Sequence, residues 1–262
     1  AENTAVGSGS LDANTTGNYN TAVGKGTLSA NTTANNNTAL GYQALILNTT
    51  GASNTGVGAN ALDENTTGNN NTALGLSALN KNTTADNNTG IGYNVLGANT
   101  TGTSNVAVGA GALDANTTAS DNIAIGKDAL GANTTGAGNV AIGSLTGDAI
   151  TTGASNVALG TQALGTNITG SYNTATGFES MFANTASNNT AYGATSLRTN
   201  TSGVANTALG QSTLYDNTAG GYNTAVGFLA LNDNTTASNN TAVGASALQL
   251  NTTGAQNTAI GM

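Results

Sequence analysis

The sequence holds few side chains that could do chemistry. Its 262 residues include no His and no Cys, so zinc, haem, iron–sulfur and Ser-His-Asp or Cys-His chemistries lose their central residues. Asp63 and Glu64 are adjacent carboxylates, a placement that predicts a solvated charge patch and not a catalytic pair. Asp121 and Asp128 lack the spaced oxygen ligands of a calcium loop. We therefore expect no catalytic, metal-binding or cofactor-binding residue, no cofactor, and a protein that is not an enzyme.

The aromatic residues offer the clearest binding chemistry, because exposed rings contact sugars and protein partners. Most of them lie in the C-terminal half of the chain. Six are candidates for contact with a host-surface glycan or protein: Tyr172, Phe178, Phe182, Tyr215, Tyr222 and Phe228. The alternative, which the sequence favours, is that they are scattered turn residues or pack between subunits. Tyr192 stands at a strand position and is expected in the core.

Asn-Thr-Thr triplets recur along the chain, for example at Asn14 and Asn65. They match the acceptor pattern for N-glycosylation. Their strict recurrence at one phase favours another interpretation, in which the Asn side chains form a hydrogen-bonded ladder that caps a turn.

Charge and composition exclude several classes of protein. Four Lys and Arg against twelve Asp and Glu give a net charge of -8, the wrong sign for binding nucleic acid. Apolar residues make up 37% of the chain and charged residues 6%, a balance unlike that of a disordered segment. No apolar run approaches the ~18 residues that a membrane-spanning helix needs.

The elements that carry these side chains follow a repeat of 17 residues. Its signature is Asn-Thr-Ala-Val-Gly with apolar variation, and we number the repeat positions from its Asn. The signature begins at Asn3, Asn20, Asn37, Asn54, Asn71, Asn88, Asn105, Asn122, Asn139, Asn156, Asn173, Asn189, Asn206, Asn223, Asn240 and Asn257. One step, from Asn173 to Asn189, is a residue short. No linker interrupts the pattern, so we expect residues 1–262 to form one continuous array.

Each repeat position has its own character. Position 4 is nearly always Val, Leu or Ile, position 9 is nearly always Leu, and position 5 is always Gly. An invariant Gly predicts a positive φ or an approach that leaves no room for a Cβ atom. All sixteen charged residues fall at positions 6, 7, 10, 11, 16 or 17. These positions predict three exposed corners between three packed segments.

The repeat predicts an all-β fold, a parallel β-solenoid of about fifteen 17-residue coils. Asn, Thr and Gly favour turns, β-branched residues favour strands, and no helical stripe persists. The strand at positions 2–4 is uncharged and apolar on both faces, which predicts that both are covered. We therefore expect self-association, as a homotrimer. Two local irregularities are expected, at the short coil near Asn184 and at residues 144–150, which lack the usual Leu and Asn.

Three strands resemble a known family. The segments that begin at Asn105, Asn122 and Asn139 read Asn-Val-Ala-Val-Gly, Asn-Ile-Ala-Ile-Gly and Asn-Val-Ala-Ile-Gly. They resemble the head repeats of YadA-like trimeric autotransporter adhesins, and the whole repeat also resembles blocks of phage tail-fibre proteins. The resemblance implies a left-handed β-roll, trimerised side by side, in an attachment fibre of a cell surface or virion. The repeat is longer than the common adhesin repeat, and no neck, stalk or anchor is present in the sequence.

Two other functions stay open. The array begins and ends in mid-pattern, which suggests either a cut from a longer protein or an end-to-end stacking subunit of an extracellular filament. Arrays of Thr on a weakly charged solenoid also suggest ice binding. A flat ice-binding plane usually has Thr-x-Thr on one face, and the repeat lacks this pattern.

Overall fold

The fold is an all-β solenoid, as the repeat predicts. The computed structural model describes residues 2–262, and no helix is present among them. The chain divides into two compact units, residues 1–135 and 136–262, and each is described by itself. Whether residues 1–262 behave as one continuous array stays a prediction.

Every repeat contributes one strand of three residues, at positions 2–4. The first unit holds β1 (Thr4–Val6), β2 (Thr21–Val23), β3 (Thr38–Leu40), β4 (Thr55–Val57), β5 (Thr72–Leu74), β6 (Thr89–Ile91), β7 (Val106–Val108) and β8 (Ile123–Ile125). The second unit holds β9 (Val140–Ile142), β10 (Val157–Leu159), β11 (Thr174–Thr176), β12 (Thr190–Tyr192), β13 (Thr207–Leu209), β14 (Thr224–Val226), β15 (Thr241–Val243) and β16 (Thr258–Ile260).

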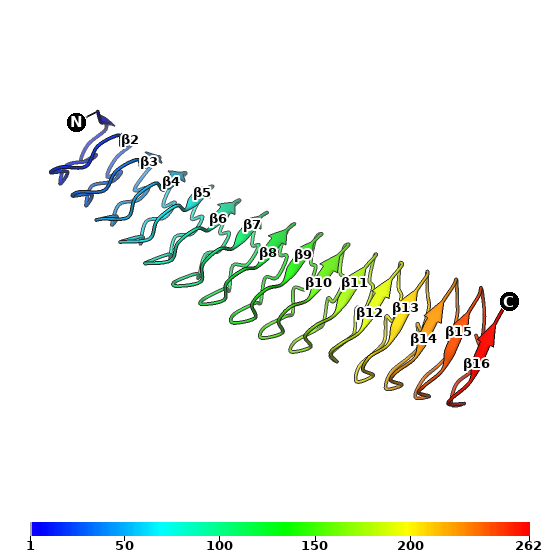
Figure 1. Cartoon of the computed structure of the whole chain (residues 1–262). Coiled ribbons are helices and arrows are strands. Elements are labelled where there is room, and N and C mark those ends of the chain that lie inside the picture. The colour runs from blue at the N-terminus through cyan, green and yellow to red at the C-terminus, as the bar shows by residue number, and fades with distance from the viewer. Residues whose placement is uncertain (1) are drawn as a thin grey trace. The chain divides into compact units, whose positions relative to one another are not determined.

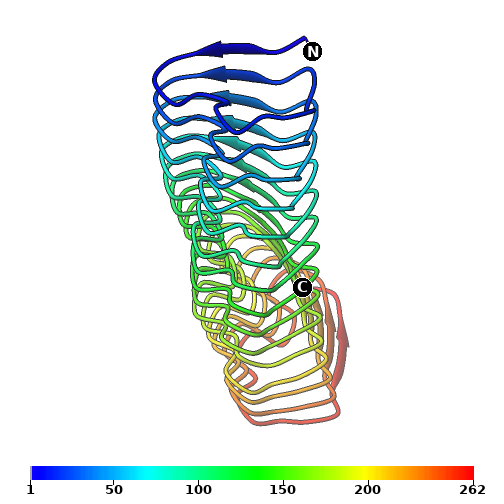
Figure 2. The same cartoon turned by 90° about the vertical axis from the view of Figure 1, so that its left-hand side faces the viewer.

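The strands within each unit pair in parallel and in sequence order. Each residue lies beside the residue at the same repeat position in the next coil, as Thr38 lies beside Thr55. In the second unit the short coil keeps this register, because Thr174 pairs with Thr190. The missing residue is absorbed in the turn after Asn184, so the predicted irregularity is confined to that turn. Figures 1 and 2 show the stacked coils of each unit.

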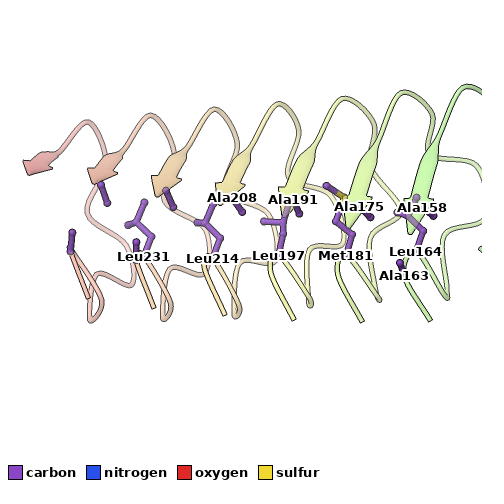
Figure 3. Close-up of a cluster of buried hydrophobic side chains, with 14 residues drawn as sticks. Ala158, Ala163, Leu164, Ala175, Met181, Ala191, Leu197, Ala208, Leu214 and Leu231 are labelled. Carbon is purple, nitrogen blue, oxygen red and sulfur yellow. The ribbon is translucent and has the colours of Figure 1, made fainter. Parts of the chain in front are cut away.

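The interior of each coil is narrow and is filled by small residues around one larger residue. Away from the terminal coils, Ala at position 3 and Leu at position 9 are fully buried in both units. In the second unit, Leu164, Met181, Leu197, Leu214 and Leu231 follow one another up the core, each opposite the Ala of a strand (Figure 3). These Leu residues have positive φ values, near 50° in both units. An L-residue is strained in this conformation, and burial of the large side chain offsets the strain.

Position 4 points out of the coil, and this corrects one prediction. The two outward positions of each strand are 2 and 4, and the inward one is 3. Tyr192, expected in the core, lies at position 4 and is 44% exposed. A three-residue strand alternates its faces, and the narrow interior accepts only the Ala face.

The Gly of position 5 meets both conditions that its invariance predicts. All sixteen copies have φ between 118° and 142°. A Cβ on Gly109 would also lie 2.5 Å from the carbonyl oxygen of Gly126 in the next coil. Adjacent coils therefore touch backbone to backbone at this corner, and any side chain would force them apart.

Two buried ladders of Asn side chains join the coils. At position 1, the Asn37 side-chain oxygen accepts the Asn54 backbone N–H at 2.9 Å, and the Asn37 side-chain amide donates to the Gly51 carbonyl at 2.9 Å. At position 12, the Asn65 amide donates to the Asn48 side chain at 2.8 Å and to the Gly68 carbonyl at 3.0 Å. These Asn residues are 0% exposed. Buried amides of this kind are stable only when paired, and the repeat supplies the partners.

Residues 144–150 keep a regular backbone, so the irregularity expected there is wrong. β9 and β10 pair without any shift of register. Gly147 takes the place of the usual Leu with φ +59°. Ile150 replaces the ladder Asn and is 1% exposed. The coil that begins at Asn139 thus has an apolar Ile in place of one ladder Asn, and its strand keeps the same register.

Gly109→Ala should destabilise the protein by on the order of 2 kcal/mol or more, because it adds a strained φ and a clash with backbone. Gly131→Ala is the control. Its Cβ would meet nothing closer than 3.4 Å, and its φ is ordinary. Thermal unfolding followed by circular dichroism compares the two variants. Equal melting temperatures of the two variants would contradict the conclusion that a side chain at position 5 forces adjacent coils apart.

Asn65→Ala should cost about 2 to 4 kcal/mol, since it removes ladder bonds and leaves the Gly68 carbonyl and the neighbouring Asn side chains short of partners. Thr67→Ala, at an exposed position of the same coil, should change stability by less than about 0.5 kcal/mol. Urea unfolding of the two variants measures the difference. A cost at Asn65 as small as that at Thr67 would contradict a stabilising ladder.

Candidate binding surfaces

The structure offers a ligand only its outer surface, because residues 2–262 enclose no pocket. Among the same residues, no three His, Cys, Asp or Glu side chains gather to hold a metal ion. None of the described chain forms a helix long and apolar enough to cross a bilayer. A ligand would therefore contact exposed side chains on the outside of the coils.

The strand face is the first surface, and we define it in each unit as the outward side chains at positions 2 and 4. It carries no charged residue. Position 4 is apolar almost throughout, with Leu40 47% exposed and Leu209 48% exposed. Val106 and Ile123 make position 2 apolar as well in the first unit. Among the described strands only β11 has Thr at both outward positions, so the Thr-x-Thr pattern is confined to one coil.

Large exposed side chains extend the strand face at the adjoining corner, position 6. We call the combined exposed residues of positions 4 and 6 the apolar ridge. Its largest members are Leu40, Tyr42, Leu74, Leu76, Ile91 and Tyr93 in the first unit, and Phe178, Tyr192, Leu209 and Phe228 in the second. Sequence reasoning placed position 6 at an exposed corner but expected Tyr192 at position 4 in the core, so it did not join the two positions into one ridge. The signal was present, since only a Gly separates position 4 from a corner.

The structure assigns two of the six candidate aromatics to internal packing. The Arg198 guanidinium lies 5.3 Å from the centre of the Phe182 ring and 5.8 Å from that of Tyr215. Arg198 Nε also donates to Glu179 at 2.6 Å, and this bond raises the pKa of the guanidinium. All three stacked residues occupy position 10 of successive coils. The stack joins the short coil to the two coils that follow it through cation–π contacts, so Phe182 and Tyr215 are partnered within the chain.

The other four candidates lie at two different corners. Phe178 and Phe228 belong to the apolar ridge, and each is 51% exposed. Tyr172 and Tyr222 lie at position 17, before the strand, and are 67% and 65% exposed. The six aromatics therefore do not form one strip, and Tyr172 and Tyr222 are the most exposed of them.

The Asn-Thr-Thr triplets are ladder elements in this structure. Their Asn residues are those of position 12, which are buried wherever a complete coil lies on each side. In the triplet that begins at Asn65, the amide nitrogen that would carry a glycan already donates two hydrogen bonds. The folded coil thus supports the interpretation that the triplets cap a turn.

Carboxylates gather at the corner of positions 10 and 11. Burial, and then the neighbouring charge of Glu64, raise the pKa of Asp63, while Lys81 opposes the shift. Burial and the charge of Asp128 raise the pKa of Asp114. Lys81 forms an ion pair with Glu64. The geometry of this corner is that of a half-buried charge patch.

No protein-family model, curated protein or solved structure matches this chain. The class that the structure defines is a repetitive parallel β-solenoid.

Replacing Asp63 and Asp114 by Asn should raise the melting temperature at neutral pH. The folded-state pKa of each carboxyl lies above the ordinary value of 3.8, so folding favours the protonated form. The resulting destabilisation is present above the folded pKa and fades as the pH falls towards the unfolded value. The gain from the double variant should therefore shrink between neutral pH and about pH 4. Melting curves across this range measure it.

Asp216→Asn is the control, because Asp216 is an exposed carboxylate at the same corner. It should shift the melting temperature little at any pH in the range. A gain from the double variant that grows on acidification would contradict the assigned direction of the pKa shifts.

Proposed function

We propose that the chain is a structural segment of an extracellular attachment fibre, of the cell-surface adhesin or viral tail-fibre kind, and that it acts as a side-by-side homotrimer. One observation carries the proposal, the uncharged strand face with its apolar ridge, which recurs coil after coil in each unit. The proposal agrees with the resemblance of the strands to trimeric adhesin head repeats.

A second and third copy of the same chain are the occupants that fit this face. Soluble monomers rarely expose long contiguous apolar patches. Here the apolar residues form a column, since each position 4 side chain lies beside its equivalent in the next paired strand. An identical chain offers an identical column at the same spacing. Rotational symmetry about an axis parallel to the columns closes the assembly and covers the face of every copy.

The small interior supports the same conclusion. Only one large side chain per coil, the Leu of position 9, is fully buried in most coils. The apolar side chains of position 4 are exposed in the single chain, and covering them would add burial that each coil otherwise lacks. Self-association therefore stabilises the fold as well as the fibre.

The corners that stay exposed in such a trimer would make the contacts for attachment. The corners repeat at the coil spacing of ~4.8 Å, the distance between paired strands. They carry the variable residues of the repeat, including all of its charges. Weak contacts repeated along a stiff segment add up on a repetitive target.

Analytical ultracentrifugation of the purified chain should show a trimer at micromolar concentration. Leu40→Lys with Leu74→Lys should weaken association by on the order of 100-fold or more, because unpaired charges would be buried in the interface. Thr50→Lys with Thr84→Lys is the matched control. These residues are exposed at position 14 of the same two coils, off the strand face, and should leave the trimer intact. A stable wild-type monomer would overturn the proposal.

A further inference from the structure

We propose that Tyr172 and Tyr222 form a binding site for a neutral, extended polysaccharide that lies along the coil axis of the second unit. The inference rests on the proposed function, since it names the class of target that the attachment fibre would bind. It is carried by a different surface from the strand face.

The backbone is held in the same way at the two Tyr residues. Their φ values are 59° and 58°. The Tyr172 backbone N–H donates to the Ala154 carbonyl of the preceding coil at 3.1 Å, and the Tyr222 N–H donates to the Val204 carbonyl at 2.9 Å. Both residues occupy position 17 and have nearly equal exposure. The rings therefore project from a rigid backbone at equivalent points, and little entropy is lost when they bind.

The spacing of the two rings suits a long ligand. They are three coil steps apart, or ~14 Å at the strand spacing. Asn188 and Ala205 occupy position 17 between them with φ 63° and 57°. The rings are too far apart to stack on each other, and Tyr172 and Tyr222 are 67% and 65% exposed. Asn188 offers a side-chain amide between the rings, and Ala205 leaves space for a ligand to pass.

The charge of this corner selects for a neutral ligand. Positions 16 and 17 carry no charged residue anywhere in residues 136–262. The whole chain has a net charge of -8, which repels anionic polymers. In the first unit the same corner holds Asp86 and Asp121. Tyr19 is the single aromatic residue at position 17 of the described part of that unit, so it has no second ring to act with. The paired, uncharged arrangement occurs in the second unit.

The chemistry of the corner favours a sugar polymer. A pyranose ring presents C–H groups on its face and hydroxyl groups at its edge, and an aromatic ring beside polar groups matches both. Asn188 supplies such a polar group at position 17 between the two rings. Without a pocket, one sugar would bind weakly. A chain that contacts both rings turns the second contact into an intramolecular one and so raises the affinity.

The test is affinity electrophoresis of the full chain through gels that contain hydroxyethyl cellulose, glycol chitin, soluble amylose or, as an anionic comparison, alginate. We expect at least one neutral polymer to retard the protein and alginate to leave its mobility unchanged. Tyr172→Ala with Tyr222→Ala should weaken binding about tenfold or more, as removal of exposed aromatic anchors does. Tyr19→Ala, at the same repeat position and 61% exposed, is the matched control and should bind as the wild type.

A second pair of variants tests the spacing. Tyr222→Ala with Ala205→Tyr keeps two Tyr residues but brings them to two coil steps, and should bind more weakly than the wild type. Tyr222→Trp keeps the ring in place and should retain binding. Absence of retardation by every neutral polymer, or unchanged binding by the double Ala variant, would overturn the proposal.

Sedimentation of the same samples separates the two proposals. If the Tyr variants and the wild type are trimers but no neutral polysaccharide binds, the polysaccharide site is wrong and the proposal of a trimeric fibre is unaffected. If the wild type is a monomer that still binds a polysaccharide through both Tyr residues, the proposal of a trimeric fibre is wrong and the polysaccharide site is supported.

Discussion

Direct contact between the backbones of successive coils is the constraint on which the rest of the structure depends. The Gly of position 5 permits it, since a Cβ there would meet the next carbonyl at distances such as 2.5 Å for Gly109. Once coils lie this close, side chains at equal positions form columns. The Asn columns can then exchange hydrogen bonds, and strands of only three residues can pair in register. A regular coil spacing makes each of these possible.

The same closeness leaves a very small interior. Ala fits at position 3, and Leu fits at position 9 only by adopting a positive φ, so the chain accepts conformational strain where it fills its core. The buried Asn ladders then stabilise the stack of coils where apolar burial is small. Their amides are fully hydrogen-bonded only because every coil offers the next one the same partners. Apolar side chains that the core cannot accept, such as Leu40 and Leu209, remain on the strand face. The close contact between successive coils thus accounts both for the small core and for the apolar side chains on the surface.

The outer corners are free of this constraint, and their roles differ. Position 6 continues the apolar strand face, position 10 carries the stack of Phe182, Arg198 and Tyr215, and position 17 carries Tyr172 and Tyr222 among polar neighbours. The residue type at these positions differs from coil to coil, while the strands of each unit keep their register. A solenoid of this kind can therefore vary its contacts with partners without altering the ladders that hold it together.

The sequence by itself determined the coil, because its 17-residue period, its invariant Gly and its confined charges emerge when the repeats are compared with one another. It also favoured the ladder interpretation of the Asn-Thr-Thr triplets, since a recurring phase implies a recurring partner. The tertiary structure alone decided which strand face is inside. Alternation in three residues defines two faces but not their direction, and the closed coil has room only for Ala or Gly at the inward strand position. That is why the prediction for Tyr192 was wrong. The partners of Arg198 also required the structure, because they come from neighbouring coils.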